Sequence, residues 1–501
     1  MITIPLLSFL ERRGLTGLVV AAFMITPSTI VGAQGSPSSR SVVLRAVEAM
    51  GGEQPLRALR TITMDAASAS FGIGQEETPE TPPRLTATQV VRTMRDIAGN
   101  RVASSTETRP AGTAGGNRTR AVMTAALGMN ETNGVQVPAT ANALAQFGRI
   151  LSWPPERLLL WALDNPTGLR PLPPKEWRQS AMNGVRLVSG QDSLSLYFDR
   201  TNGYLTIIEV VTDDPILGDR STAQLLTRWT PAGALKYPRQ IDVLVNGRVQ
   251  SAATVTAVSL DAPLADSLFA IPDSIAARAR AAQPAAPPAL SVQLNQLAPG
   301  VWRAEGGTHH SLVVEQADHL LVVEAPQSTA RSRAVLDTLR SRFANKPVRQ
   351  AVMTHHHWDH SGGIREYLAA GIAVVAHERN IPFVRQIAAA RKTVAPDELS
   401  RRPRAPIVTA VRDSLVIGGG EGRVVLYRMS TSHAEGLLAA YVPAHRILFT
   451  SDVLSPAPML AQLGSAEVVA FARLRGISVD RFAGGHGGVA AWADIERAAG
   501  R

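Results

Sequence analysis

The stretch His355-His356-His357-Trp358-Asp359-His360-Ser361-Gly362-Gly363 gathers five side chains that can bind a metal ion, together with a glycine turn, within nine residues. The apolar segment before it, residues 348–354, predicts a buried strand, and residues 364–368 after it begin a helical pattern. The stretch is therefore expected on a loop from a strand to a helix, which is where α/β proteins place their chemistry.

The spacing within this stretch predicts two neighbouring metal sites. His355 and His357 are two residues apart in an extended loop, so both rings can point to the same side and bind one ion. Asp359 and His360 follow at the turn into the helix and can face a second ion. His356 is expected to point away from both sites and to act as a spacer. Because one ion needs three or four protein ligands, further ligands must come from other strand ends.

Three downstream positions meet this requirement. His433 lies in a loop of small residues, Asp452 follows the apolar strand predicted at 446–450, and His486 is flanked by two glycines on each side. All three are expected in loops that connect strands to helices. The chain contains no cysteine, so any metal must be held by histidine and carboxylate.

This pattern of His-x-His-x-Asp-His with a loop histidine, a strand-end aspartate and a glycine-flanked histidine resembles the metallo-β-lactamase superfamily, over residues 290–501. The resemblance implies an αββα sandwich and two zinc ions, with iron as an alternative metal. It implies that the first zinc is bound by His355, His357 and His433, the second by Asp359, His360 and His486, and that Asp452 bridges both.

Four further residues are candidates for roles around the ligands. Much of the superfamily has Asp-Thr-Gly after its second strand, whereas this chain has Glu-Ala-Pro beginning at Glu324. The longer carboxylate can still orient the metal-binding loop. His377 ends a predicted strand and is expected to support the ligands or the fold. His309 and His310 follow a glycine pair and can reach the mouth of the site, and His310 is the candidate for substrate binding.

The expected reaction is hydrolysis of a small carbonyl compound, which means an ester, a lactone, a thioester or a β-lactam. Two zinc ions that share a hydroxide lower the pKa of bound water to about 7 and so supply a nucleophile at neutral pH. Asp359 is the candidate to orient the hydroxide and handle its proton. Asp452 in place of a cysteine argues against the thiolate-using lactamases, and His357 in place of a carboxylate argues against di-iron oxygen reductases.

Two other functions remain open from the sequence. A mononuclear iron persulfide dioxygenase shares the His-x-His-x-Asp-His motif. A non-enzymatic carrier or binding protein of the cell envelope would use the N-terminal part of the chain instead. Short alternating runs and turn signals in residues 39–272 predict a β-rich domain, with hairpins at 193–211 and 243–249 and a loop at 111–134.

Residues 39–272 resemble the outer-membrane lipoprotein-sorting (carrier) family, through an opening helix that ends in Met50-Gly51-Gly52 and the closing run 268–272. That resemblance implies a curved sheet, or half-barrel, able to hold a lipid or acyl ligand. The alternative is a docking module without a ligand. An Ala/Pro-rich linker is expected at 273–289, at least partly extended by its prolines.

The first 33 residues have the layout of a bacterial signal peptide. Arg12 and Arg13 precede an apolar run at 15–25, and small residues follow at 31–33. We therefore expect a periplasmic or secreted protein without a membrane span in the mature chain. The net charge of +10 comes mostly from scattered arginines rather than basic blocks, so no nucleic-acid partner is expected.

Overall fold

The computed structural model describes residues 37–281, 290–457 and 460–500. The predicted signal peptide at 1–33 lies outside the described residues. Among the helices of the described part, none combines the length and the apolar character needed to cross a membrane.

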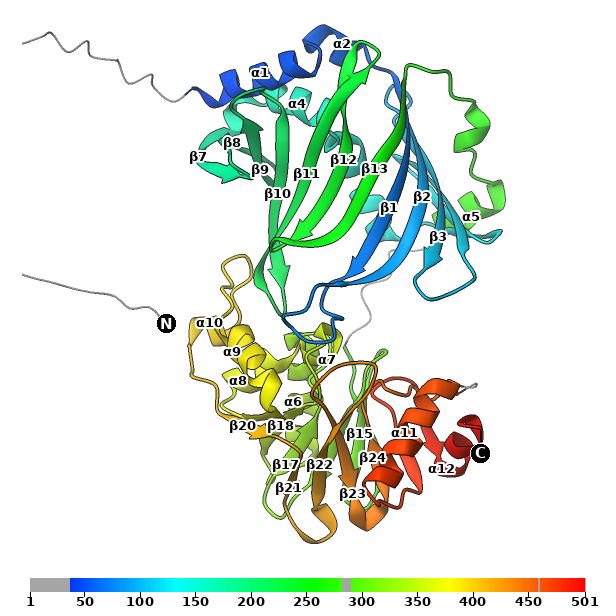
Figure 1. The fold of residues 1–501 in the computed structure, drawn as a ribbon, viewed down its shortest axis with the longest axis vertical. Coiled ribbons are helices and arrows are strands. Elements are labelled where there is room, and N and C mark those ends of the chain that lie inside the picture. The colour runs from blue at the N-terminus through cyan, green and yellow to red at the C-terminus, as the bar shows by residue number, and fades with distance from the viewer. Residues whose placement is uncertain (1–36, 282–289, 458–459, 501) are drawn as a thin grey trace, which may run out of the picture. The chain divides into compact units, whose positions relative to one another are not determined.

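The N-terminal half is built on one antiparallel sheet of 13 strands, whose order is β6-β5-β4-β3-β2-β1-β13-β12-β11-β10-β9-β8-β7. The sheet ends at β6 and β7, so it is open, and Figure 1 shows its long, bent strands. The strands are β1 (Thr61–Gly72), β2 (Arg84–Asp96), β3 (Arg101–Pro110), β4 (Asn117–Thr124), β5 (Gly128–Thr132), β6 (Val135–Pro138), β7 (Leu169–Trp177), β8 (Ser180–Ser189), β9 (Asp192–Asp199), β10 (Leu205–Asp214), β11 (Gly218–Ala232), β12 (Leu235–Val245) and β13 (Arg248–Leu260).

Helices α1 (Ser39–Met50) and α4 (Pro155–Asp164) pack on one face of this sheet, and α5 (Asp273–Ala281) packs on the other. Val43 and Val47 of α1 and Leu159 of α4 share a buried core with Leu196 and Phe198 of β9. The alternation in β9 makes this possible, because every second side chain faces the helices. The other helices of this half are α2 (Glu53–Ala58) and α3 (Ala141–Ser152).

Both predicted hairpins are present, and Asn246 and Gly247 form the β12–β13 turn with φ of 45° and 84°. The predicted loop at 111–134 is wrong, because most of it forms strands β4 and β5. Val122 and Met129 on those strands are buried against Ile275 of α5. Threonine and glycine in this segment hid the strands, which long-range pairing stabilises. The predicted linker begins as the helix α5, and the prolines expected to extend it lie outside the described residues.

The C-terminal half consists of two mixed sheets with helices on both outer faces. The first has the order β14-β15-β16-β17-β18-β19-β20 and the second the order β21-β22-β23-β24-β25-β26. Their strands are β14 (Gln293–Ala298), β15 (Val301–Glu305), β16 (Ser311–Glu315), β17 (Leu320–Val323), β18 (Val348–Met353), β19 (Ala373–His377), β20 (Val408–Val411), β21 (Ser414–Ile417), β22 (Val424–Met429), β23 (Leu437–Val442), β24 (Ile447–Phe449), β25 (Arg481–Ala483) and β26 (Val489–Ala491).

Three buried clusters define the layers of this half. Val323 and Val375 of the first sheet pack against Leu438 and Phe449 of the second. A second cluster joins the first sheet to the helices of residues 329–389, and a third joins the second sheet to those of residues 462–498. The helices are α6 (Thr329–Arg342), α7 (Trp358–Ser361), α8 (Ile364–Ala369), α9 (Ile381–Ala389), α10 (Glu398–Arg401), α11 (Gln462–Leu474) and α12 (Trp492–Ala498). The layer order is helix, sheet, sheet, helix, so the predicted αββα sandwich is confirmed.

Candidate metal centre

The histidine-rich stretch lies where the sequence predicts it. Strand β18 runs parallel to β17 and β19, so the carboxyl ends of these strands meet at one edge of the first sheet. Residues 354–357 form the loop after β18, and α7 begins at Trp358. His355 and His357 therefore lie on the loop, and Asp359 and His360 lie on the first helical turn.

Four side chains form a first ligand group, defined as His355, His357, His433 and Asp452, with one candidate ligand atom each within 4.8 Å of the others. His433 Nε2 lies 3.3 Å from His355 Nε2 and 3.0 Å from Asp452 Oδ2. Asp452 Oδ1 lies 3.6 Å from His355 Nε2. The three histidines predicted for the first ion are thus together.

A second ligand group comprises His309, Asp359, His360 and His486, within the same 4.8 Å limit. His360 Nε2 lies 3.1 Å from His486 Nε2, and Asp359 Oδ2 lies 3.3 Å from His309 Nε2. Asp452 Oδ2 is 3.3 Å from His360 Nε2, so this carboxylate reaches both groups. That is the place expected of a bridging ligand.

The hydrogen-bond directions in the second group suit a cation. His360 Nδ1 lies 2.6 Å from Glu324 Oε2, and His486 Nδ1 lies 3.0 Å from the carbonyl oxygen of Thr308. Because both oxygens accept, each Nδ1 carries the hydrogen. The two Nε2 atoms then face each other at 3.1 Å, which is tolerated only with a proton or a cation between them. A metal ion fits this arrangement.

The hydrogen bonds of the first group likewise leave ligand atoms free for a metal ion. Thr354 Oγ1 donates to Glu324 Oε1 and so accepts from His355 Nδ1 at 3.0 Å, which leaves His355 Nε2 free to bind a metal. The Nδ1 atom of His357 and the Oδ1 atom of Asp452 are buried and have no hydrogen-bond partner among the described residues. Buried polar atoms are nearly always paired, so a metal ion is the partner that suits them.

The comparisons with known proteins agree with this geometry. Residues 304–486 match the family model of the metallo-beta-lactamase superfamily, and all the residues of both ligand groups lie in the matched segment. This segment belongs to the metallo-beta-lactamase superfamily. Superfamily members bind metal ions and are generally metal-dependent hydrolases.

Several solved metallo-beta-lactamases resemble this half of the chain. FIM-1 from Pseudomonas aeruginosa, in its mono-zinc form, is 18% identical, with 43% of this chain and 96% of that chain covered and a TM-score of 0.34. The enzyme from Hirschia baltica is 18% identical, with 42% and 96% covered and a TM-score of 0.33. The enzyme from Erythrobacter litoralis is 23% identical, with 42% and 94% covered and a TM-score of 0.32.

A curated relative is the 2,4-dinitroanisole O-demethylase subunit alpha of Nocardioides sp. (strain JS1661). It is 25% identical over 158 residues, which are 32% of this chain and 45% of that relative. The chain therefore spans less than half the length of this relative.

Burial and nearby charges set the protonation of the side chains in the ligand groups. Burial lowers the pKa of His357 to about 4 and that of His355 well below its usual value. These rings are therefore neutral at pH 7, as metal ligands must be. Burial opposes ionisation of Asp452, but His355, His360 and His433 hold the pKa of its carboxyl far below the usual range. Asp452 is thus a carboxylate.

Glu324 lies behind both ligand groups. It is fully buried, has a left-handed φ of 86°, and joins Thr354 to His360 through its two oxygens. Burial lowers the pKa of His360, but the nearby Glu324 and Asp452 outweigh it and raise that pKa. Glu324 therefore orients ligands of both groups, which is the role that the sequence suggests for it.

The remaining predicted histidines lie outside the two groups. The imidazole of His377 donates to the carbonyl of Arg412 and packs behind Gly436, in the loop that carries His433. His356 donates to the carbonyl of Glu76 and belongs to neither group. The ring of His310 is buried, and its backbone N–H donates to Gly485. A role of His310 in substrate binding stays a prediction.

The sequence reasoning missed two parts of this centre. His309 was expected only near the mouth, yet its Nε2 contacts Asp359, and its ring centroid lies 4.0 Å from that of His486. Its position after a glycine pair at the end of β15 was the available signal. The side chain of Gln75 donates to Asp359 Oδ1 at 2.7 Å from the N-terminal sheet, and no pattern in the sequence links these two residues.

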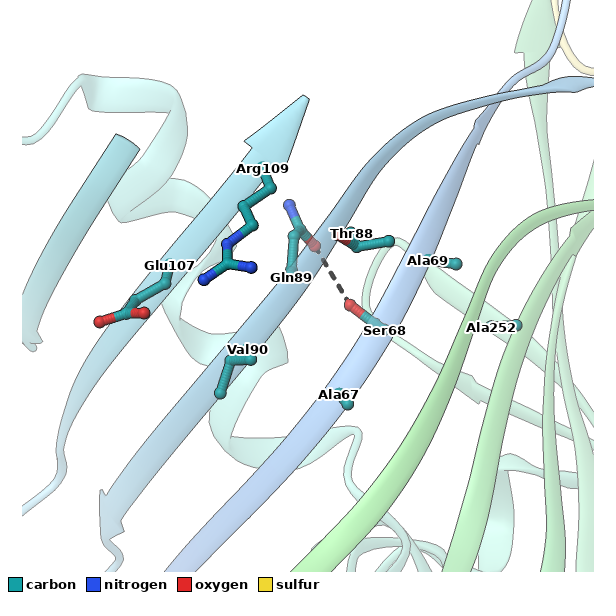
Figure 2. Close-up of a pocket in the computed structure, with 9 residues that line it drawn as sticks. All are labelled: Ala67, Ser68, Ala69, Thr88, Gln89, Val90, Glu107, Arg109 and Ala252. Atoms are coloured by element: carbon teal, nitrogen blue, oxygen red, sulfur yellow. Dashed lines mark hydrogen bonds between the residues drawn. The ribbon is translucent and has the colours of Figure 1, made fainter. Parts of the chain in front are cut away.

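The hollow drawn in Figure 2 is a different feature. It is lined by residues of β1, β2, β3 and β13 in the N-terminal sheet, including the small residues Ala67, Ala69 and Ala252, and has a volume of about 450 Å³. Its charged lining residues are Glu107 and Arg109, and none of the residues of either ligand group borders it. It is not a part of the metal centre.

Proposed function

We propose that this chain is an exported dinuclear zinc hydrolase that cleaves an ester, a lactone, a thioester or a β-lactam. The observation that carries the proposal is the pair of ligand groups with Asp452 between them, 3.0 Å from His433 and 3.3 Å from His360. This arrangement would let the chain hold two ions side by side. The metallo-beta-lactamase fold of residues 304–486 supports hydrolysis as the reaction type.

A bound zinc ion would lower the pKa of water to about 7 and polarise the substrate carbonyl. The residues of the chain would prepare the site for that chemistry. Asp359 is held by Gln75 on one oxygen and faces His309 on the other, so its orientation is fixed. Burial raises its pKa, but His309, His360 and Gln75 outweigh this and hold the pKa below the usual range. Asp359 is therefore ionised at neutral pH, as a metal ligand or a proton acceptor must be.

The ligand chemistry supports two ions and is compatible with zinc. Imidazole and carboxylate suit zinc and also iron, so the residue types alone do not separate a zinc hydrolase from an iron persulfide dioxygenase. A mononuclear iron enzyme would need only one of the two groups. Two histidines of the second group also have supporting acceptors, namely Glu324 for His360 and the carbonyl of Thr308 for His486. This favours the dinuclear hydrolase.

The full chain purified without chelators tests the proposal. We expect about two zinc ions per chain by inductively coupled plasma mass spectrometry, and hydrolysis of at least one member of a panel of nitrocefin, acyl-homoserine lactones, thioesters and aryl esters. The name of the Nocardioides relative makes 2,4-dinitroanisole a further probe. Removal of the metal should abolish turnover, and added zinc should restore it. Turnover that survives metal removal, or iron with persulfide oxidation, would contradict the proposal.

A second proposal concerns the N-terminal sheet, namely that it binds a fatty acyl chain. The support is an apolar hollow of about 390 Å³ lined by Met64, Ile150, Trp153, Leu226 and Ile241, among others. Lipid extracted from the purified full chain and identified by mass spectrometry should be retained by the parent and lost in Ile150→Asp. Parent protein without lipid, or equal retention in the variant, would rule it out.

Export rests on the signal-peptide layout of residues 1–33 and is likewise a proposal. Expression of the full chain in a Gram-negative host should yield periplasmic protein whose N-terminus, by Edman sequencing, begins at or near Gln34. Recovery in the cytoplasm with the N-terminus intact would contradict export.

A further inference from the structure

The loop between β1 and β2, residues 73–83, reaches the metal centre from the N-terminal sheet. We call it the β1–β2 loop. Trp358 N donates to the carbonyl of Gly74 at 3.2 Å, and Gln75 Nε2 donates to Asp359 Oδ1 at 2.7 Å. The carbonyl of Glu76 accepts from His357 Nε2 at 2.9 Å. These contacts join residues more than 280 positions apart in the chain.

The loop is held in this shape by a buried ion pair. The carboxylate of Glu76 is 1% exposed, accepts from the backbone N–H of Gly74 at 2.9 and 3.0 Å, and lies 2.6 Å from Arg248 Nη2. Arg248 also donates to the carbonyl of Thr81 at 2.8 Å. The conformation of the loop is therefore fixed by β13 of its own sheet, independently of the metal centre.

Gly74 shows that the loop and the metal-binding stretch fit closely. Its φ is +83°, and a Cβ added there would lie 2.3 Å from Cδ2 of Trp358. No real Cβ approaches an indole ring so closely, so a larger residue would push the loop away from Trp358. Trp358 lies between the ligands His357 and Asp359 in the chain, so the displacement would reach both groups.

We propose that the β1–β2 loop is a positioning element of the metal centre, in which the Glu76 carbonyl orients His357 and the Gln75 amide orients Asp359. A carbonyl that accepts from His357 Nε2 fixes the hydrogen on that nitrogen and leaves Nδ1 for the first ion. The proposal rests on the proposed function only in requiring that metal binds. It makes the N-terminal sheet a part of the working site rather than an accessory domain.

Gly74→Ala with Gly134→Ala as its matched control tests the proposal. Gly134 lies in another hairpin turn of the same sheet with φ of +87°, and a Cβ there would meet no described atom within 4 Å. Both variants thus carry similar backbone strain, and only Gly74→Ala adds the clash with Trp358. We expect Gly74→Ala to bind zinc about tenfold or more weakly and to alter the visible spectrum of the cobalt-substituted protein, while Gly134→Ala matches the parent. Equal zinc affinity and equal spectra in all three proteins would overturn the proposal.

Gln75→Leu keeps the test decisive if Gly74→Ala fails to fold. It removes the amide donor to Asp359, and its matched control is Gln89→Leu, whose amide accepts from Ser68 in the hollow of Figure 2. Circular dichroism should show folded protein for both. We expect Gln75→Leu to weaken binding of the second zinc ion about tenfold and Gln89→Leu to leave it unchanged. Parental binding of both ions by Gln75→Leu would contradict a positioning role.

The two proposals fail in different ways. A parent protein that binds two ions but hydrolyses none of the panel contradicts the proposed function, while the zinc affinities of the variants still decide the role of the loop. If the parent hydrolyses substrate and Gly74→Ala and Gln75→Leu match it in zinc affinity and spectrum, the proposed function is supported. The positioning role of the β1–β2 loop is then rejected.

Discussion

The two ligand groups differ more in the protonation of their histidines than in their burial. In the first group His355 and His357 are at most 1% exposed, and Asp452, which reaches both groups, has 11% of its side chain exposed. In the second group the side chain of Asp359 is 36% exposed, and a histidine from the β15–β16 segment, His309, joins the set. His433 of the first group is 26% exposed and His360 of the second is buried, so each group has two buried and two partly exposed ligands. Burial keeps His357 neutral, whereas Glu324 and Asp452 raise the pKa of His360 despite its burial, so we expect the second ion to be the more easily lost.

Loss of the shared carboxylate should affect both groups and gives the largest expected effect. Asp452→Ala removes the contacts to His433 and His360 at once. We expect hydrolysis to fall by about a thousandfold or more, and bound zinc to fall below the parental level at both sites. Steady-state kinetics and metal analysis measure this. Asp413→Ala, an exposed carboxylate paired with Arg475, is the control, and an Asp452→Ala variant as active as this control would exclude a shared ligand.

Glu324→Gln should reveal how far one buried carboxylate serves both groups. Glu324 accepts from Thr354 and contacts His360 at 2.6 Å, so the loss of its charge should weaken the second group more than the first. We expect zinc affinity at the second site to fall by about 10- to 100-fold. Isothermal titration with zinc resolves the two steps, with the exposed Glu421→Gln as control. Equal weakening of both steps would show that the groups are not supported separately.

Acid should separate the groups because the pKa of His357 in the first group is lowered and that of His360 in the second is raised. Burial lowers the pKa of His357 to about 4, so this ring stays neutral and available to metal down to about pH 5. Despite burial, Glu324 and Asp452 raise the pKa of His360, so without metal this ring holds a proton that a second ion must displace. The affinity of the second group for its metal ion should fall about tenfold for each pH unit below the pKa of His360.

Dialysis against buffers from pH 7 to pH 5, followed by metal analysis, checks this order. We expect the second ion to be lost first and the first ion to remain. Simultaneous loss of both ions, or earlier loss of the first, would contradict the assigned protonation states.

His309→Ala should give the smallest effect, since three other ligands of the second group remain. We expect a several-fold to tenfold weaker second zinc ion and an unchanged first ion. His319→Ala is the matched control, because His319 pairs with Asp318 at the surface and belongs to neither group. If His309→Ala and His319→Ala bind zinc equally well, His309 is not a ligand of the second ion.

Sequence reasoning could select the residues of the first group, which the structure brings together, because the pattern that marks them is local. His355 and His357 share one loop, and the strand before them is recognisable from its apolar run. His433 was selected from its loop of small residues and Asp452 from the apolar strand before it. The predicted strand-to-helix loop is present at Asp452, between β24 and α11, whereas His433 lies between the strands β22 and β23. The αββα layers followed from alternating strands and helices and from the family resemblance.

The parts that escaped prediction depend on contacts distant in the sequence. The β1–β2 loop meets the metal centre through residues such as Gln75, and neither periodicity nor spacing encodes that contact. His309 and His310 are neighbours with the same chemistry, yet the ring of His309 contacts Asp359 while that of His310 joins neither ligand group. The strands at 117–132 were hidden by their composition and become evident only through pairing with β3.

The position of bound metal in crystals of the full chain tests the central claim most directly. Anomalous scattering at the zinc edge should show two peaks, one among His355, His357 and His433 and the other among His309, Asp359, His360 and His486, with Asp452 between them. A single peak at one group, or no peak at either group in protein that contains zinc, would contradict a dinuclear centre.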